Sequence, residues 1–312
     1  MDLLRNGKDI FISTLKFFKK YPVCIVPLLI CWCIYAWVIL YSEYYFDWNK
    51  YNWQINFGIA FLCYIIFSFM YGFACLFILE LMQQAETTGR VRPTKAFFDA
   101  LLRDFWKALP ILFIWALIWF LLMLLSAVSS SKSDDEEEAD EAFTARAAVG
   151  TLMGEGERIS FSSAFLHVMS KIVRMVTFMI LPIIAWEDDS PKKAYKKGLS
   201  ILSDIKAEFA VAFGVTGVFT VILMFWPSIL LSVDAKFHLN LPEPVWYAVL
   251  IYIAFAMSLS FLVEQLYMAE LYLWYKEWKR ENERRAAIGK KPIKLNKTTK
   301  PSFIDDIRSL NE

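Results

Sequence analysis

The sequence predicts an all-α, polytopic membrane protein with six transmembrane helices. Three observations support this fold class: six long apolar stretches, an uneven distribution of basic residues between them, and a composition that is 57% hydrophobic and 17% aromatic. The net charge of only +1 hides that uneven distribution. A soluble fold would have to enclose several fully apolar helices within 312 residues, so we set that alternative aside.

Each apolar stretch is long enough to span a bilayer as a helix. At a rise of 1.5 Å per residue, about 20 residues cover the roughly 30 Å hydrocarbon core. Helices are expected because lipid cannot satisfy backbone polar groups, and because the stretches lack the period of 2 that barrel strands need. The six predicted spans are 23–41, 55–79, 108–128, 168–186, 209–233 and 245–263.

The basic residues predict which side of the membrane each loop faces. Of the 33 lysines and arginines, 26 lie in alternate polar segments, 5 lie in the other set, and only Lys171 and Arg174 fall inside a span. Cytosolic loops carry an excess of such residues, so both chain ends are expected in the cytosol. The uncharged part of the fourth span is only 175–186, but removing that span would place the basic tail outside. We divide the chain into a membrane domain, 1–275, and a basic cytosolic tail, 276–312.

A shorter amphipathic stretch precedes the first, third and fifth spans on the cytosolic side. An amphipathic helix with a basic polar face lies in the membrane interface and holds its cations toward the headgroups. We therefore predict three interfacial helices, over 4–21, 94–109 and 191–208. The segment Phe17–Pro22 partly recurs as Phe105–Pro110. This similarity indicates either a threefold repeat of helix plus hairpin, or unrelated helices that share the aromatic and basic residues common at membrane entry.

Basic residues at the cytosolic edge and in the tail are the predicted contacts with anionic lipid headgroups or with a cytosolic or membrane protein partner. Close to an anionic surface, each contributes up to about 1 kcal/mol. No nucleic-acid recognition motif accompanies them, so nucleic acid is not an expected partner. The residues are Lys19, Lys20, Lys107, Lys192, Lys193, Lys196, Lys197, Lys279, Arg280, Arg284 and Arg285.

The outer loop from 129 to 160 contains a block of acidic residues between 134 and 141. Repulsion between like charges and the scarcity of apolar residues predict that this loop is disordered. Two functional alternatives are a docking segment for a basic partner and a loose trap for divalent cations. The acids lack the alternating spacing and central glycine of an EF-hand calcium loop.

Charged residues inside the spans, or at their edges, are the candidates for a substrate or ion path. His167, Lys171 and Arg174 share one helix face, because they are spaced i, i+4, i+7. One interpretation turns this face into the bundle toward an anionic substrate. The interpretation that we favour pairs both cations with the acidic outer loop. Glu80 and Glu264 lie at the cytosolic ends of predicted spans, where headgroups and basic residues are expected to solvate them.

Motifs for catalysis, metal binding or cofactor binding are missing from the sequence. Only His167 and His238 are present, which excludes a multi-histidine metal centre. No nucleophile elbow, zinc-peptidase, Walker A or dinucleotide fingerprint occurs. The five cysteines match no zinc or thiol-redox spacing and are expected to pack as small apolar residues. We therefore expect no cofactor and no enzymatic activity.

Two segments of the chain resemble a family of uncharacterised bacterial six-helix membrane proteins. The first comprises residues 88–98 and 111–118, and the second comprises TFMILPIIAWE at 177–187 followed by SPKKAYKKGL at 190–199. The shared pattern is an apolar run with proline, then glutamate, a small residue or proline, alanine and a basic helix. A similar rhythm occurs in the membrane domain of some glycerophosphodiester phosphodiesterases. The resemblance covers roughly 15–232 and implies a bacterial cytoplasmic (inner) membrane protein, but no catalytic residues.

Three functions remain open from the sequence. The first is a non-enzymatic scaffold or accessory protein that works through its interfacial helices and basic tail. The second is a small transporter or channel for an anionic or amphipathic substrate. The third is a protein that confers immunity to a membrane toxin, or an enzyme that acts on lipid. Fold alone does not decide among them.

Overall fold

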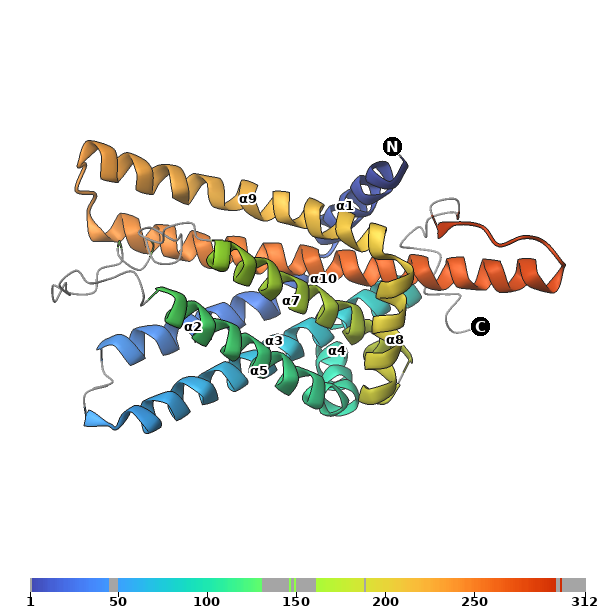
Figure 1. The fold of residues 1–312 in the computed structure, drawn as a ribbon, viewed down its shortest axis with the longest axis horizontal. Coiled ribbons are helices and arrows are strands. Elements are labelled where there is room, and N and C mark those ends of the chain that lie inside the picture. Colours follow the sequence, from blue (N-terminus) through green and yellow to red (C-terminus); the bar gives the residue numbers. More distant parts are fainter. Residues whose placement is uncertain are drawn as a thin grey trace.

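The structure is a computed structural model that describes residues 2–44, 50–130, 146, 149, 161–187, 189–295 and 298. Every regular element in these residues is helical (Figure 1), which confirms the predicted all-α class. The α-helices are α1 (Asp2–Lys20), α2 (Val26–Tyr44), α3 (Trp53–Thr88), α4 (Pro93–Asp99), α5 (Phe105–Ser130), α7 (Phe161–Glu187), α8 (Pro191–Asp204), α9 (Lys206–Phe237) and α10 (Glu243–Ala287). A 3-10 turn, η1 (Pro22–Ile25), precedes α2, and a π turn, η3 (Ala100–Asp104), joins α4 to α5.

Five stretches of helix are long and apolar enough to cross a membrane, so the chain has the character of a multi-pass membrane protein. These are Gln54–Ala85, Pro93–Leu122, Val168–Glu187, Lys206–Phe237 and Glu243–Ala287. A sixth crossing is reached only if Leu3–Lys20 and Pro22–Ile34, which meet at 99°, count together. The bend falls at Pro22, which begins η1 and lacks the N–H that a continuing helix would use. The fourth predicted span, whose uncharged part is short, lies on α7 and is confirmed as a helix.

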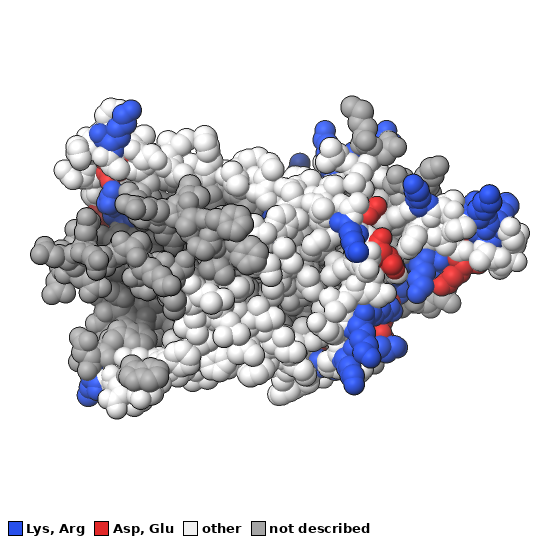
Figure 2. Space-filling model, in the orientation of Figure 1, with Lys and Arg blue, Asp and Glu red and all other residues white. Residues whose placement is uncertain are grey.

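Charged residues gather at the two ends of the molecule. On the face shown in Figure 2, the band between these ends is uncharged, as expected for a surface in contact with lipid chains. Helices α1, α4 and α8 lie at the same end as the last turns of α10, whereas α9 turns into α10 at the opposite end (Figure 1). The end that contains α1, α4, α8 and residues 276–295 is called the charged end below.

The three amphipathic helices connect the bundle into a ring. Helix α4 packs against α3, α8 packs mainly against α7 and α5, and α1 packs against α9 and α10. Each amphipathic helix therefore contacts the hairpin that precedes it in the ring, and α1 closes the ring on the last hairpin. Helices α3, α7 and α10 return through the interior, where α3 contacts α5 and α7, and α10 contacts α7 and α2. This arrangement favours the threefold repeat over three unrelated helices.

The second amphipathic segment does not form the separate helix predicted over 94–109. Helix α4, the π turn and α5 follow one another without a break, because the residues at both junctions, Ala100 and Phe105, keep right-handed helical dihedral angles. Such a π turn inserts one extra residue into an α-helix, often at a functional site. Here the turn holds Arg103 and Asp104, which interact with Glu80 on α3.

Helix α10 extends 24 residues beyond the predicted end of the last span at 263. The segment 264–275 is buried throughout and belongs largely to the main hydrophobic core. The predicted boundary between domain and tail, at 275/276, therefore falls inside a single helix. After Ala287 the chain folds back: Asn282 exchanges two hydrogen bonds with the backbone of Ile293, and Trp278 donates a third to the same residue. The acidic block at 134–141 and the tail from 299 lie outside the described residues.

Candidate functional site

Helix α7 carries two cations into the interior of the bundle. Arg174 is the midpoint of α7 and lies about 20 Å along the helix from either end at 1.5 Å per residue. Lys171 is one turn earlier on the same face, as predicted. His167 is one further turn away on the backbone of α7, but its side chain lies outside the described residues.

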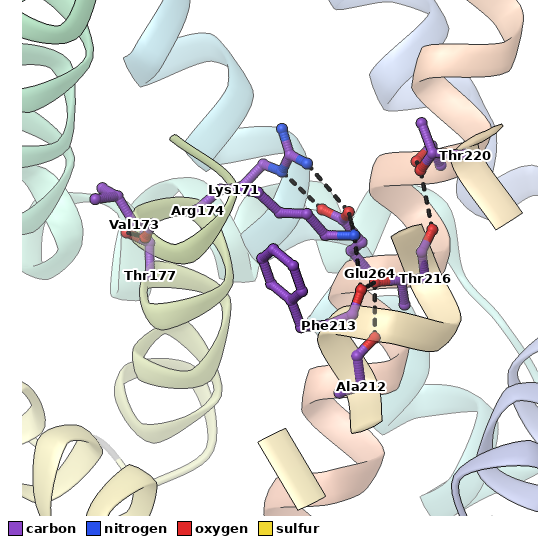
Figure 3. Close-up of polar contacts among 10 residues, drawn as sticks. Lys171, Val173, Arg174, Thr177, Ala212, Phe213, Thr216, Thr220 and Glu264 are labelled. Atoms are coloured by element: carbon purple, nitrogen blue, oxygen red, sulfur yellow. Dashed lines mark hydrogen bonds and ion pairs between the residues drawn. The ribbon is translucent and has the colours of Figure 1, made fainter. Parts of the chain in front are cut away.

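Both cations share the carboxylate of Glu264 on α10 (Figure 3). The Arg174 Nε lies 2.7 Å from Glu264 Oε2 and its Nη2 lies 3.1 Å from Oε1, which makes the pair bidentate. The Lys171 Nζ lies 3.4 Å from Oε1 and donates a hydrogen bond of 3.0 Å to the carbonyl oxygen of Phe213 on α9. The exposed side-chain fractions are 0% for Glu264, 11% for Arg174 and 14% for Lys171, so the cluster is screened from solvent.

Aromatic rings and small residues enclose this ion cluster, which we define as Lys171, Arg174 and Glu264. The Arg174 guanidinium stacks 4.0 Å from the ring centroid of Phe261, and the Lys171 ammonium lies 4.7 Å from that of Phe213. Such contacts stabilise a desolvated cation electrostatically. On α9, a Cβ added at Gly217 would lie 3.1 Å from Lys171 Nζ, so the glycine leaves space for the ammonium.

The ion cluster contradicts two expectations from the sequence. The favoured interpretation paired Lys171 and Arg174 with the acidic outer loop, but the structure turns both into the bundle. Glu264 was expected to be solvated near headgroups, whereas it is fully buried because α10 continues past it. Two cations then meet one carboxylate, so the cluster holds an excess of positive charge when all three groups are ionised. A buried positive charge of this kind attracts an anion strongly because the surrounding dielectric is low.

Glu80 lies in a different cluster, on α3. Its Oε1 accepts a hydrogen bond of 2.5 Å from Arg103 Nη2, and the same nitrogen donates to the carbonyl oxygen of Ala185 at the end of α7. Asp104 accepts from Arg103 Nε at 2.9 Å. The predicted basic partner of Glu80 is thus present, although the Glu80 side chain is only 3% exposed. This cluster ties α3, the π turn and α7 together.

At the charged end, the carboxylate of Glu187 accepts contacts from three donor groups. Lys276 Nζ of α10 lies 2.7 Å away, and Lys197 of α8 and the hydroxyl of Tyr272 also contact it. The neighbouring Asp189 accepts a hydrogen bond from Lys193, and this bond raises the pKa of the Lys193 ammonium. The sequence gives no local signal for this role of Glu187, because its partners lie on two other helices, α8 and α10.

A cavity of about 400 Å³ opens between α8 and α10 beside Glu187. Four of its lining side chains are basic, two are acidic and two are tyrosines. The lining residues are Glu187, Lys197, Ser200, Ile201, Tyr272, Tyr275, Lys276, Lys279, Arg280 and Glu283. Three predicted contact residues therefore meet in one cavity: Lys197, Lys279 and Arg280.

The other predicted contact residues are spread over the same end of the molecule. They lie on the last turn of α1, at the start of α5, along α8 and on the last turns of α10; they are Lys19, Lys20, Lys107, Lys192, Lys193, Lys196, Arg284 and Arg285. Within the described part of the chain, no group of three or more His, Cys, Asp or Glu side chains could hold a metal ion. The five cysteines are free thiols, and Cys24, Cys31 and Cys75 are buried.

Comparison with known proteins adds no assignment, because no protein-family model, no curated protein and no solved structure matches the chain. The resemblance to the bacterial six-helix family therefore remains a prediction from the residues.

Proposed function

We propose that this protein is a non-enzymatic scaffold or accessory protein of a bacterial cytoplasmic membrane, with its charged end in the cytosol. The observation that carries the proposal is the single helix α10, which runs from the membrane-spanning region into the charged end without a break. Its middle section is core, since Trp274 and Tyr272 are almost fully buried. The basic last turns of α10 are therefore held rigidly relative to the membrane.

Rigidity matters because a partner that binds a preformed surface orders fewer side chains and loops on binding. The folded-back segment after α10 adds to this effect. Its Leu295 is buried in the main core, and the Asn282 side chain donates to the carbonyl oxygen of Ile293 and accepts from the N–H of the same residue. The charged end is thus a fixed surface in the described residues, where the sequence predicted a separate basic tail.

Exposed apolar side chains on the amphipathic helices support contact with the membrane surface. Phe98 on α4 is 57% exposed, and Tyr195 and Leu199 on α8 are also exposed, next to the lysines of that helix. A helix in the interface plane places apolar side chains among the acyl chains and cations among the headgroups. This arrangement would hold the charged end against an anionic membrane surface while leaving the end of α10 accessible to a protein partner.

Site-specific photo-crosslinking in living cells tests the scaffold function. A photoreactive benzoylphenylalanine at Arg284, which is exposed on the last turns of α10, should give discrete crosslinked products with a cytosolic protein. The matched control places the same residue at Lys236, an exposed basic residue at the opposite end. Equal background labelling at the two positions, with no discrete product at Arg284, would contradict the proposal.

Transport of an anionic substrate is the second candidate, and the ion cluster favours it. Replacing a buried ion pair with apolar residues is often neutral or stabilising, so such a cluster is weak support for a purely stabilising role. Ionisable groups at this depth commonly mark a substrate or ion pathway. The Lys171 ammonium, held mainly through backbone and ring contacts to α9, is the member best placed to release Glu264 and meet an anion.

Anion flux into proteoliposomes tests this second candidate. Nitrate, acetate and phosphate serve as probes, and osmotic swelling reports their entry. Gly217→Ala should reduce flux because the added Cβ would crowd Lys171 Nζ, whereas Gly214→Ala adds a Cβ that meets nothing within 4 Å. Vesicles that remain impermeable to every probe, or flux that the two variants reduce equally, would exclude a role of the ion cluster in anion transport.

A further inference from the structure

The cavity between α8 and α10 has the volume of a small-ligand site and a lining that is mostly charged. Binding pockets for small molecules commonly occupy roughly 300–1,000 Å³, and this cavity measures about 400 Å³. It is formed by two elements that Glu187 connects, since Lys197 comes from α8 and Lys276 from α10. The walls are therefore fixed relative to each other before any ligand arrives.

The lining favours an anion. Lysine ammonium groups carry three donors each, so Lys197 and Lys276 keep donors available beyond those that Glu187 accepts. Lys279 is exposed, and the Arg280 guanidinium lies 3.7 Å from the carboxylate of Glu277 on the same helix. The basic side chains outnumber the acidic ones by four to two. An incoming anion would thus meet a surplus of cationic donors, one from α8 and three from α10.

Phosphate oxygens match these donors best. A phosphate group offers several charged acceptors, and arginine and lysine bind it through charge-assisted hydrogen bonds. A carboxylate would use fewer of the donors because it has only two oxygens. Tyr275 and Ser200 also line the cavity and would lie near the rest of a phosphate ester.

We infer that this cavity binds a phosphate-bearing anion, supplied either by a lipid headgroup at the membrane surface or by a soluble phosphate compound. This inference deepens the proposed function and rests on it in one respect: the charged end must face a compartment that contains such phosphates. It does not depend on a protein partner. Crosslinking at Arg284 and phosphate binding in the cavity can therefore fail separately.

The test uses the purified full chain and two probes. In detergent, titration calorimetry measures binding of inorganic pyrophosphate at constant ionic strength. In nanodiscs of phosphatidylcholine with or without phosphatidic acid, native mass spectrometry measures lipid that stays bound. Binding of phosphatidic acid alone identifies the headgroup as the source, binding of pyrophosphate alone identifies a soluble source, and binding of neither overturns the inference.

Matched variants separate a site from general electrostatic attraction. The pair Lys279→Gln and Arg280→Gln removes two cations from the lining, and loss of two charge-assisted contacts should weaken binding roughly tenfold or more. The control pair, Lys192→Gln and Arg284→Gln, removes two exposed cations from the same end without touching the cavity. Equal weakening in both pairs would show that only net charge matters and would overturn the inference.

One further variant is expected to strengthen phosphate binding, where the others weaken it. Glu187→Gln frees Lys197 and Lys276 from a competing carboxylate, so the phosphate probe should bind several-fold more tightly. A merely structural role of Glu187 predicts unchanged or weaker binding. If this variant does not fold, Lys279→Gln alone still tests the phosphate site. The Lys279 side chain is exposed and outside the core, so weaker binding of the phosphate probe by this variant reports the lost contact and not a folding defect.

Discussion

Replacing Glu264 should destabilise the protein far more than replacing either cation that shares it. Glu264→Gln leaves Lys171 and Arg174 buried with no carboxylate between them. Removing one partner of a buried ion pair costs about 3–5 kcal/mol, because the remaining charge loses its compensation in a low dielectric. Glu264 has no exposed side-chain surface through which water could replace its charge.

The cations are predicted to differ from each other as well. Arg174→Met removes the bidentate pair, but Lys171 still neutralises Glu264, so the cost should stay below the roughly 3–5 kcal/mol of leaving a buried charge uncompensated. Lys171→Met leaves the bidentate pair intact and removes the surplus charge, so it should cost less than about 1.5 kcal/mol. The double variant Lys171→Met, Glu264→Gln should lose less stability than the sum of the two single variants, because removing the lysine leaves one uncompensated buried cation where Glu264→Gln alone leaves two.

Reversible unfolding in mixed micelles with increasing sodium dodecyl sulfate, followed by far-ultraviolet circular dichroism, measures these free energies. The expected order of loss is Glu264→Gln, then Arg174→Met, then Lys171→Met. The reasoning is refuted if Lys171→Met destabilises as much as Glu264→Gln. A cost below about 1 kcal/mol for Glu264→Gln would equally show that water reaches the cluster.

Two further predictions concern packing and the folded-back segment. Gly198→Ala would place a Cβ 2.6 Å from a side chain of α7 and should cost about 1–3 kcal/mol in the same unfolding assay, whereas Gly58→Ala, with nothing within 4 Å, should not destabilise. Equal effects would argue against close packing of α8 on α7. Asn282→Ala removes both bonds to Ile293, so trypsin should cut the segment after α10 faster, while the exposed neighbour Glu283→Ala leaves the rate unchanged. An unchanged rate in the first variant would show that this segment is held by other contacts.

Five of the six spans were predictable because length and hydropathy act locally, whereas the first, 23–41, does not appear as a spanning helix by itself. The fourth is the clearest case, since the positions of basic residues required it and α7 is long and apolar enough to cross a membrane. The continuation of α10 beyond the last predicted span was not predicted, because Glu264 was taken to mark the membrane edge. The segment 266–275 after it has one charged residue, Glu270, and its continued apolar character was a signal that the helix and the core go on.

For the candidate sites, the sequence predicted which residues share a helix face but not which residues they contact on other helices. Periodicity placed Lys171 and Arg174 on one helix face, which is a property of neighbouring residues. Their partner lies 90 residues from Arg174, and nothing in one sequence reports which helices pack together. The same limit applies to Glu187, whose lysine and tyrosine contacts come from α8 and from α10, 85 residues away in the case of Tyr272.

Orientation of the charged end is the claim on which the proposed function depends most directly. After replacement of the five native cysteines, single cysteines introduced by Lys290→Cys, at the charged end, and by Lys236→Cys, at the opposite end, can be labelled with a membrane-impermeant maleimide in intact cells. Both positions are exposed. The charge distribution predicts labelling of the Lys236 variant in intact cells and of the Lys290 variant only after the cells are opened. Labelling of the Lys290 variant in intact cells would place the charged end outside and contradict the account.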